Sequence, residues 1–124
     1  MAPDVQAPAD WPWPADLDGP LAAPDQHRVI FENDRVRVLE TTIRAGEITP
    51  LHTYRSPTLM YVVSGSQFVR RDETGATLFD TRTAEPPFTM PPAMWSDFTP
   101  AHTLENIGTD DLVVIGVELK DAAG

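Results

Sequence analysis

Residues 45–65 read AGEITPLHTYRSPTLMYVVSG, and this stretch carries both the strand pattern and the first chemistry of the chain. A glycine turn at Gly46 leads into a short segment with His52, and a β-branched and apolar run then ends at Gly65. Short apolar runs bounded by glycine and proline are typical of strands. We therefore expect a turn, a histidine-bearing strand and a second strand here.

The same alternation of strand and turn extends over residues 28–119. Three hairpins are predicted, with turns at residues 32–34, 72–75 and 107–111. The strands they join are RVIF (28–31) with RVRVLETTI (35–43), TLMYVVSG and SQFVRR (58–71) with ATLFDT (76–81), and HTLEN (102–106) with LVVIGVEL (112–119). Prolines interrupt the only long helical candidate, so the chain is predicted to be all-β, as a sandwich, barrel or jelly roll.

The first 26 residues differ from the rest in composition. They contain six of the thirteen prolines and show neither a helical nor a strand period, which predicts an irregular arm over 1–26 and one barrel domain over 27–124. Trp11, Trp13 and Leu17 give this arm apolar surface. It either packs against its own barrel or a neighbouring subunit, or remains a solvated tail.

Length and charge exclude several classes of function. A chain of 124 residues has room for one hydrophobic core, and 41% hydrophobic content is ordinary for a globular protein. A net charge of −10 would repel phosphate backbones and anionic membranes, so no nucleic acid or membrane partner is expected. The N-terminus lacks a signal-peptide pattern and the chain has no cysteine, which favours a cytoplasmic location and leaves only nitrogen and oxygen to hold a metal.

A second motif, TPAHTLENIG at residues 99–108, places His102 four positions before Asn106. Together with Gly46, His52 and Gly65, this spacing resembles the two motifs of the cupin superfamily. The resemblance covers roughly residues 28–119. It implies a cupin double-stranded β-helix, a jelly-roll barrel whose cavity carries the function.

Two departures from the cupin pattern concern the metal. Tyr54 stands where the second histidine of the His-x-His pair is expected, and Thr58 stands at the glutamate position, so half of the usual ligand set is missing. In the family the pair works because residues two apart on a strand share a face. The resemblance leaves His52 and His102 either as ligands of a divalent transition metal (Fe, Mn, Zn or Ni) or as cavity-lining histidines of a metal-free site.

Further residues are candidates for the site. For catalysis we expect Tyr54 and His102 as an acid–base pair, with Asp97 and Glu105 as candidate carboxylates. The substrate pocket is predicted to include Met60, Gln67, Trp95, Phe98 and Arg55. His27 is expected at the surface or at the entry to a strand. Arg70 and Arg71 are expected in solvent, and the alternative is that an arginine at the cavity mouth selects a carboxylate substrate.

Three functions remain open on this basis. The protein is a metal-dependent dioxygenase, isomerase or decarboxylase, a metal-free lyase, cyclase or isomerase, or a non-catalytic binding protein. Each acts on a small-molecule ligand. Because a small barrel must cover its edge strands, a homodimer is also expected.

Overall fold

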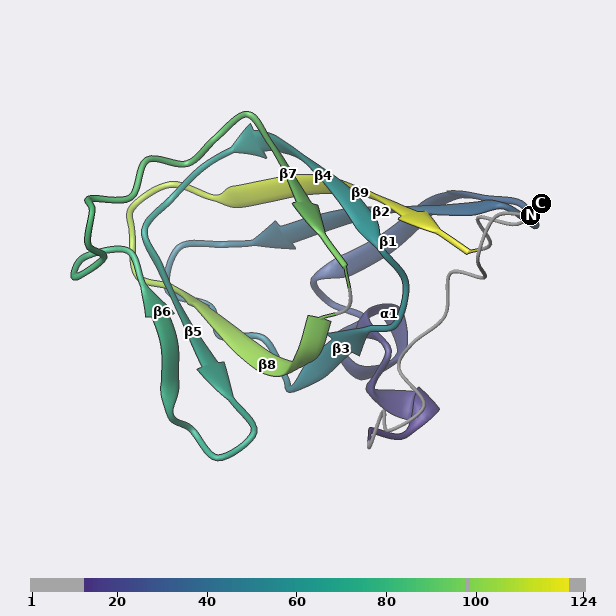
Figure 1. The fold of residues 1–124 in the computed structure, drawn as a ribbon, viewed down its shortest axis with the longest axis horizontal. Coiled ribbons are helices and arrows are strands. Elements are labelled where there is room, and N and C mark those ends of the chain that lie inside the picture. Colours follow the sequence, from purple (N-terminus) through teal and green to yellow (C-terminus); the bar gives the residue numbers. More distant parts are fainter. Residues whose placement is uncertain (1–12, 98, 121–124) are drawn as a thin grey trace.

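The structure, a computed structural model, describes residues 13–97 and 99–120. Two antiparallel sheets face each other and enclose an interior, as Figure 1 shows. The described residues form a 3-10 turn η1 (Ala15–Leu17), a one-turn helix α1 (Gly19–Ala22) and nine strands. None of the helices in these ranges is long and apolar enough to cross a membrane.

The larger sheet has five strands in the order β1-β2-β9-β4-β7. Its strands are β1 (His27–Glu32), β2 (Val36–Ile43), β4 (Thr58–Ser64), β7 (Ala93–Ser96) and β9 (Leu112–Leu119). The C-terminal strand β9 lies in the middle of this sheet, paired with β2 on one side and β4 on the other.

The smaller sheet has four strands in the order β3-β8-β5-β6. Its strands are β3 (His52–Tyr54), β5 (Phe68–Asp72), β6 (Thr77–Asp80) and β8 (Thr99–Asn106). Ile43, Phe68, Leu104 and Leu112, which come from both sheets, form one buried cluster between them. The prediction of an all-β jelly-roll barrel is thereby confirmed.

Two of the three predicted hairpins are present, and the third is wrong. The turns at residues 32–34 and 72–75 join β1 to β2 and β5 to β6 within one sheet. The turn at 107–111 instead carries the chain from β8 in the smaller sheet to β9 in the larger one. The link from β4 to β5 also crosses between the sheets, so these two strands are not part of one hairpin.

Asn106 fixes the start of the crossover from β8 to β9. Its amide nitrogen donates to the carbonyls of Ile43 and Asp110, and its amide oxygen accepts hydrogen bonds from Ser66 and Gly108. The side chain is completely buried. The motif asparagine is therefore a structural residue that ties the end of β2 and the β4–β5 link to the 107–111 turn at one end of the barrel.

The described part of the N-terminal arm packs against its own barrel. Asp18 forms a bridge with Thr53 of β3 and a double hydrogen bond with Arg37 of β2. Ala23 is fully buried, and α1 lies beside β3 (Figure 1). The arm was predicted to lack helical structure, but residues 15–22 form two short helical turns. Trp11 lies outside the described residues.

Candidate active site

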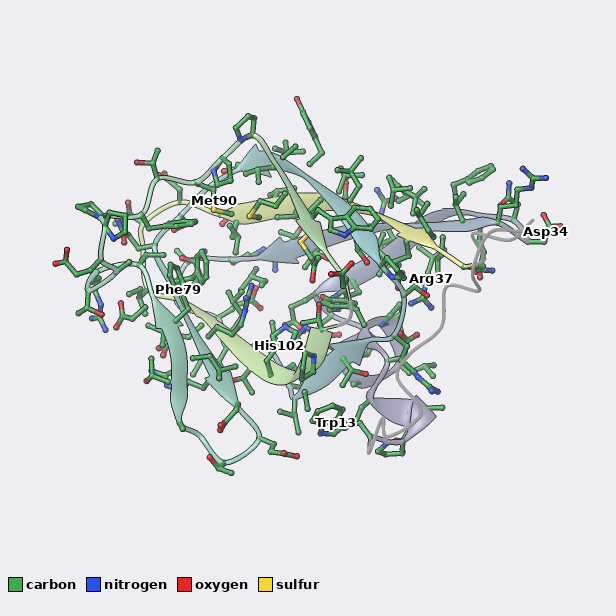
Figure 2. All side chains as sticks on the ribbon, in the orientation of Figure 1. Trp13, Asp34, Arg37, Phe79, Met90 and His102 are labelled. Carbon is green, nitrogen blue, oxygen red and sulfur yellow. The ribbon has the colours of Figure 1, made fainter. Side chains whose placement is uncertain are left out.

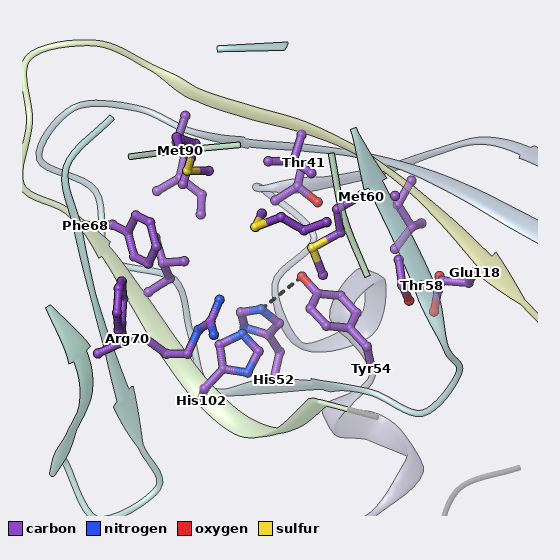
Figure 3. Close-up of a pocket in the computed structure, with 18 of the residues that line it drawn as sticks. Thr41, His52, Tyr54, Thr58, Met60, Phe68, Arg70, Met90, His102 and Glu118 are labelled. Carbon is purple, nitrogen blue, oxygen red and sulfur yellow. Dashed lines mark hydrogen bonds between the residues drawn. The ribbon is translucent and has the colours of Figure 1, made fainter. Parts of the chain in front are cut away.

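A cavity of about 300 Å³ lies between the two sheets, and Figure 3 shows the side chains that line it. Its walls are mostly apolar, with a small polar group at one end. The lining residues are Leu39, Thr41, Ile43, His52, Tyr54, Thr58, Met60, Phe68, Arg70, Phe79, Phe88, Met90, Met94, His102, Leu104, Leu112, Val114, Gly116 and Glu118. This combination of apolar walls and few polar groups is typical of small-molecule sites.

His52 and His102 are brought together by strand pairing. They are direct partners across the β3–β8 ladder, and their ring centroids lie 4.3 Å apart. His52 and Tyr54, two positions apart on β3, both reach the same cavity, as alternation along a strand requires. The structure therefore places these three predicted side chains at one site.

A backbone carbonyl fixes the orientation of each of these imidazoles. Nδ1 of His52 lies 2.8 Å from the carbonyl oxygen of Pro50, and Nδ1 of His102 lies 2.9 Å from that of Pro100. A carbonyl can only accept a hydrogen bond, so Nδ1 carries the proton in both rings. In the neutral ring Nε2 is then a bare acceptor. The two nitrogens that remain for chemistry are the Nε2 atoms.

Tyr54 links His52 to a third histidine. Its hydroxyl lies 3.1 Å from Nε2 of His52 and makes a short hydrogen bond with Nε2 of His27. His27 donates from Nδ1 to the carbonyl of Ala23, 3.0 Å away, so this ring has the same tautomer. One hydroxyl proton therefore faces two acceptor nitrogens.

His27 corrects an expectation from the sequence. It does open strand β1, as one alternative held, but it is buried and in contact with the site. Its ring lies edge-on to His52 and Tyr54, with centroids 5.0 and 5.5 Å away. The alternative that it lies at the surface is wrong.

Burial keeps the polar cluster neutral. Loss of water lowers the pKa of His52 to about 4 and that of His102 to about 3, and the nearby Arg70 adds to both effects. Burial also lowers the pKa of His27, although the carbonyl of Ala23 and the charge of Asp18 oppose this. Burial raises the pKa of Tyr54 well above its ordinary range. At neutral pH the histidines are uncharged bases and the tyrosine is an uncharged acid.

Arg70 was expected in solvent, but its side chain lies in the cavity wall. Residues alternate along β5, so Phe68 and Arg70 face the interior while Arg71 points outward to an ion pair with Glu105. Figure 3 shows Arg70 extending toward His102. Its guanidinium carbon lies 5.9 Å from the centroid of the Phe68 ring.

An ion-pair network closes the wall beside Tyr54. Arg37 binds Glu118 at 2.7 Å and Asp18 at 2.8 Å, which joins β2, β9 and the segment before α1. Burial raises the pKa of Glu118, and the bond to Arg37 opposes that rise. This carboxylate lines the cavity but is already engaged by a cation.

The other predicted site residues lie elsewhere. Met60 lines the cavity, whereas Trp95 is 54% exposed and bonds to Asp97 on the outside. Glu105 pairs with Arg71 outside the cavity. Gln67 and Arg55 each border a separate depression, Gln67 with Thr81 and Arg55 with Lys120. Phe98 lies outside the described residues.

The residues present do not fit a transition-metal centre. Such a centre normally takes three or four protein donors, and His52 and His102 supply two, since Nε2 of the third histidine, His27, is engaged by the Tyr54 hydroxyl. Within 13–97 and 99–120 no three histidine or carboxylate side chains are grouped to hold an ion. The other polar residues of the lining are neutral hydroxyls, the Glu118 carboxylate already bound by Arg37, and the Arg70 cation, which repels a second positive charge.

Comparison with known proteins agrees with the fold. No protein-family model and no curated protein matches the chain. A cupin domain from Bordetella pertussis Tohama I aligns with a TM-score of 0.59 at 18% identity, over 76% of this chain and 91% of that one. An RmlC-like cupin family protein from Methanocaldococcus jannaschii, described as a double-stranded β-helix, aligns with a TM-score of 0.55 at 14% identity, over 76% and 78%.

A third structure, a protein with a double-stranded β-helix domain from Klebsiella pneumoniae, aligns with a TM-score of 0.54 at 15% identity, over 79% of this chain and 78% of that one. These likenesses and the two-sheet topology show the same architecture. The chain has the cupin fold, as its two motifs predicted.

Proposed function

We propose that this protein is an acid–base enzyme of the isomerase or lyase type, which acts on a small molecule in the barrel cavity and needs no metal. The observation that carries the proposal is the Tyr54 hydroxyl held between the Nε2 atoms of His27 and His52. Beside it, Nε2 of His102 has no hydrogen-bond partner among the described residues. The cavity thus offers a proton donor and a bare base side by side.

These groups suit proton transfer at a carbon next to a carbonyl group. His102 would accept the proton from carbon at Nε2, and Tyr54 would donate its hydroxyl proton to the carbonyl oxygen, which yields an enol. The phenolate formed recovers a proton when the enol collapses to the rearranged product. Before the transfer the hydroxyl proton is shared with His27 and His52, and it turns to the carbonyl oxygen when the substrate is bound. The ring contacts of His27 and His52 hold the tyrosine side chain in place, and the apolar walls limit the access of water.

Proton exchange in deuterated water tests this function. Protein stripped with a chelator, and checked for metal by elemental analysis, is incubated with a panel of small ketones, aldehydes and 2-oxo acids. We expect loss of the ¹H NMR signal from the carbon next to the carbonyl group for at least one compound. Tyr54→Phe and His102→Asn should each slow this exchange by about 100-fold or more.

Tyr61→Phe is the matched control, because Tyr61 lies on β4 and is exposed on the outer face of the larger sheet. It should leave the rate unchanged. Exchange that appears only after addition of Fe²⁺, Mn²⁺, Zn²⁺ or Ni²⁺, or that survives Tyr54→Phe, would contradict the proposal. Binding of panel compounds without any exchange would instead indicate a non-catalytic binding protein.

A further inference from the structure

The cavity wall contains a partly buried cation without a counterion. Arg70 lines it, and among residues 13–97 and 99–120 no carboxylate forms an ion pair with this side chain. Its Nε atom is buried and has no hydrogen-bond partner. An unpaired charge away from water costs free energy, so a native protein that keeps one there needs a reason for it.

Arg37 provides a comparison within the same barrel. It is also partly buried, and it is bound by two carboxylates, Asp18 and Glu118, through hydrogen bonds of 2.7 to 3.0 Å. Neither of these carboxylates bonds to Arg70. Among the described residues, Arg37 is therefore paired with two carboxylates, whereas Arg70 has no ion-pair partner and faces the cavity.

The open guanidinium fits a carboxylate. Its planar N–H groups match the two oxygens of a carboxylate in a bidentate arrangement. Phe68 already covers part of the guanidinium, which leaves its polar edge directed at the cavity (Figure 3). A single monoanion balances the one charge, whereas a dianionic phosphate would leave a net charge buried among apolar walls.

The remaining walls define the other part of the ligand. Phe68, Phe79, Phe88 and Met90 pack around the end of the cavity that holds Arg70. The cavity of about 300 Å³ is roughly twice the ~150 Å³ that accommodates benzene in an engineered apolar cavity. One ring or branched chain with a carboxylate and a short linker fits this space.

The anion would also act on the neighbouring histidines. The charge of Arg70 is one of the causes that lower the pKa of His52 and of His102. A bound carboxylate cancels that charge and so raises both pKa values, which strengthens the two imidazoles as bases. The base would therefore become most effective when the ligand is present.

We propose that Arg70 binds the carboxylate of the substrate, and that the substrate is a small monocarboxylic acid with an aromatic or branched aliphatic body. This substrate class rests on the acid–base function proposed above, but the binding step is independent of catalysis. Phenylacetate and its neutral analogue phenylacetamide are suitable probes because they share their shape and differ in charge.

Isothermal titration calorimetry with both probes tests the assignment. Wild-type protein should prefer phenylacetate over phenylacetamide by on the order of 10-fold to 100-fold. Arg70→Met keeps the length and apolar character of the side chain, and it should abolish this preference. Arg71→Met is the matched control, because Arg71 is the adjacent residue and faces outward, and it should keep the preference.

The unliganded stability of Arg70→Met provides a second measurement. Because this variant removes an unpaired and partly buried charge, it should unfold at the same or a higher urea concentration than wild type. A variant that folds and still prefers phenylacetate as wild type does would overturn the assignment, and so would a wild type that binds both probes equally.

Tyr54→Phe separates this proposal from the enzymatic one. It should keep the preference for phenylacetate while losing proton exchange. A variant that keeps both would contradict only the enzymatic proposal, because the carboxylate preference would remain. A variant in which the preference itself disappears would contradict the assignment to Arg70.

Discussion

Three neutral imidazoles in one interior make stability depend on pH. The pKa of His52 is lowered to about 4 and that of His102 to about 3, because both rings are buried. Between about pH 6.5, where a free histidine titrates, and pH 4, the unfolded chain binds protons that the native chain does not. The free energy of unfolding should therefore fall as the pH falls through this window and level off above it.

Urea unfolding at pH 7, 6 and 5 measures this effect. Each histidine contributes a slope of up to about 1.4 kcal/mol per pH unit. The double variant His52→Gln/His102→Gln should show a smaller slope, with His27 contributing the remainder. Asp80, whose pKa is lowered to about 2 by its bonds to Arg82, acts only at lower pH. A wild-type stability that does not change from pH 7 to 5 would refute the burial argument.

Part of the site was predictable from single residues. His52, Tyr54 and His102 were predicted because motif spacing and strand alternation place them on one face. His27 was not, because its burial depends on the turn at Ala23, which no period in the sequence indicates. A retrospective signal does exist for the two motif histidines, since each follows a proline by two positions, and these prolines supply the carbonyls that fix the tautomers.

Arg70 shows why the direction of a side chain on a strand was not predicted from the sequence. Two adjacent arginines on a strand must face opposite sides, so one of the pair 70 and 71 had to point inward. Arg70 is the inward arginine because it lies two positions after Phe68 and so shares its face of the strand. That Phe68 faces the interior is known only from the buried core of the structure. The sequence alone favours solvent for both.

At the level of elements, α1 positions the tyrosine. Gly19 approaches so closely that an added Cβ would lie 2.7 Å from the Tyr54 ring and 3.1 Å from Nε2 of His27. Gly19→Ala should displace Tyr54 and destabilise the protein by about 1–3 kcal/mol, as overpacking does. Urea unfolding measures the loss, and the ¹H–¹⁵N spectrum of the histidine rings reports the altered contact.

Gly65→Ala is the matched control for this prediction. An added Cβ there would meet the Met90 side chain at 3.4 and 3.5 Å, which is ordinary van der Waals contact. Because alanine also reduces the freedom of the unfolded chain, the control should be neutral or slightly stabilising. If Gly19→Ala and Gly65→Ala destabilise the protein equally, the close approach of Gly19 to the Tyr54 ring is not the cause of the loss.

Hairpins and crossovers differed in how well the sequence predicted them. The β1–β2 and β5–β6 hairpins follow from tight turns, and at the second of these Gly75 adopts a φ of +88°. The turn at 107–111 has similar residues but connects strands of different sheets. Turn composition does not distinguish these cases. The difference comes from the pairing of β9 with distant strands, which is a tertiary effect.

For the whole molecule, the outer face of the larger sheet is notable. Residues in register across all five strands form one apolar row, namely Trp95, Leu59, Val117, Val38 and Phe31. Trp95, Leu59 and Phe31 are exposed, as are Tyr61 and Val63 further along β4. Five strands at about 4.8 Å spacing make a face with an area on the order of 500 Å², near the upper end of patches on monomers.

We propose that a second copy of the chain covers this face and makes a homodimer. The apolar row runs across the whole width of the sheet, which suits the self-complementary contact of a two-fold dimer. Its area is of the same order as the roughly 800 Å² that each partner contributes to a stable interface. A highly charged partner would find no matching charges along this row.

Light scattering at high micromolar concentration measures the assembly, and we expect the mass of a dimer. Leu59→Glu should give a monomer, because it places a charge in the centre of the row. Leu78→Glu is the control, since Leu78 is also exposed but lies on β6 of the other sheet. A monomeric wild type, or a Leu59→Glu variant that remains dimeric, would contradict this arrangement.

The central position of β9 bears on how the chain is made by the ribosome. Strands β2 and β4 each have β9 as a neighbour, yet β9 comes after every other described strand in the chain. Until residues 112–119 emerge from the exit tunnel, these two strands each present an open edge and the interior cannot close. The nascent chain therefore passes through a stage with two incomplete half-sheets, the stage at which chaperones protect exposed strands from aggregation.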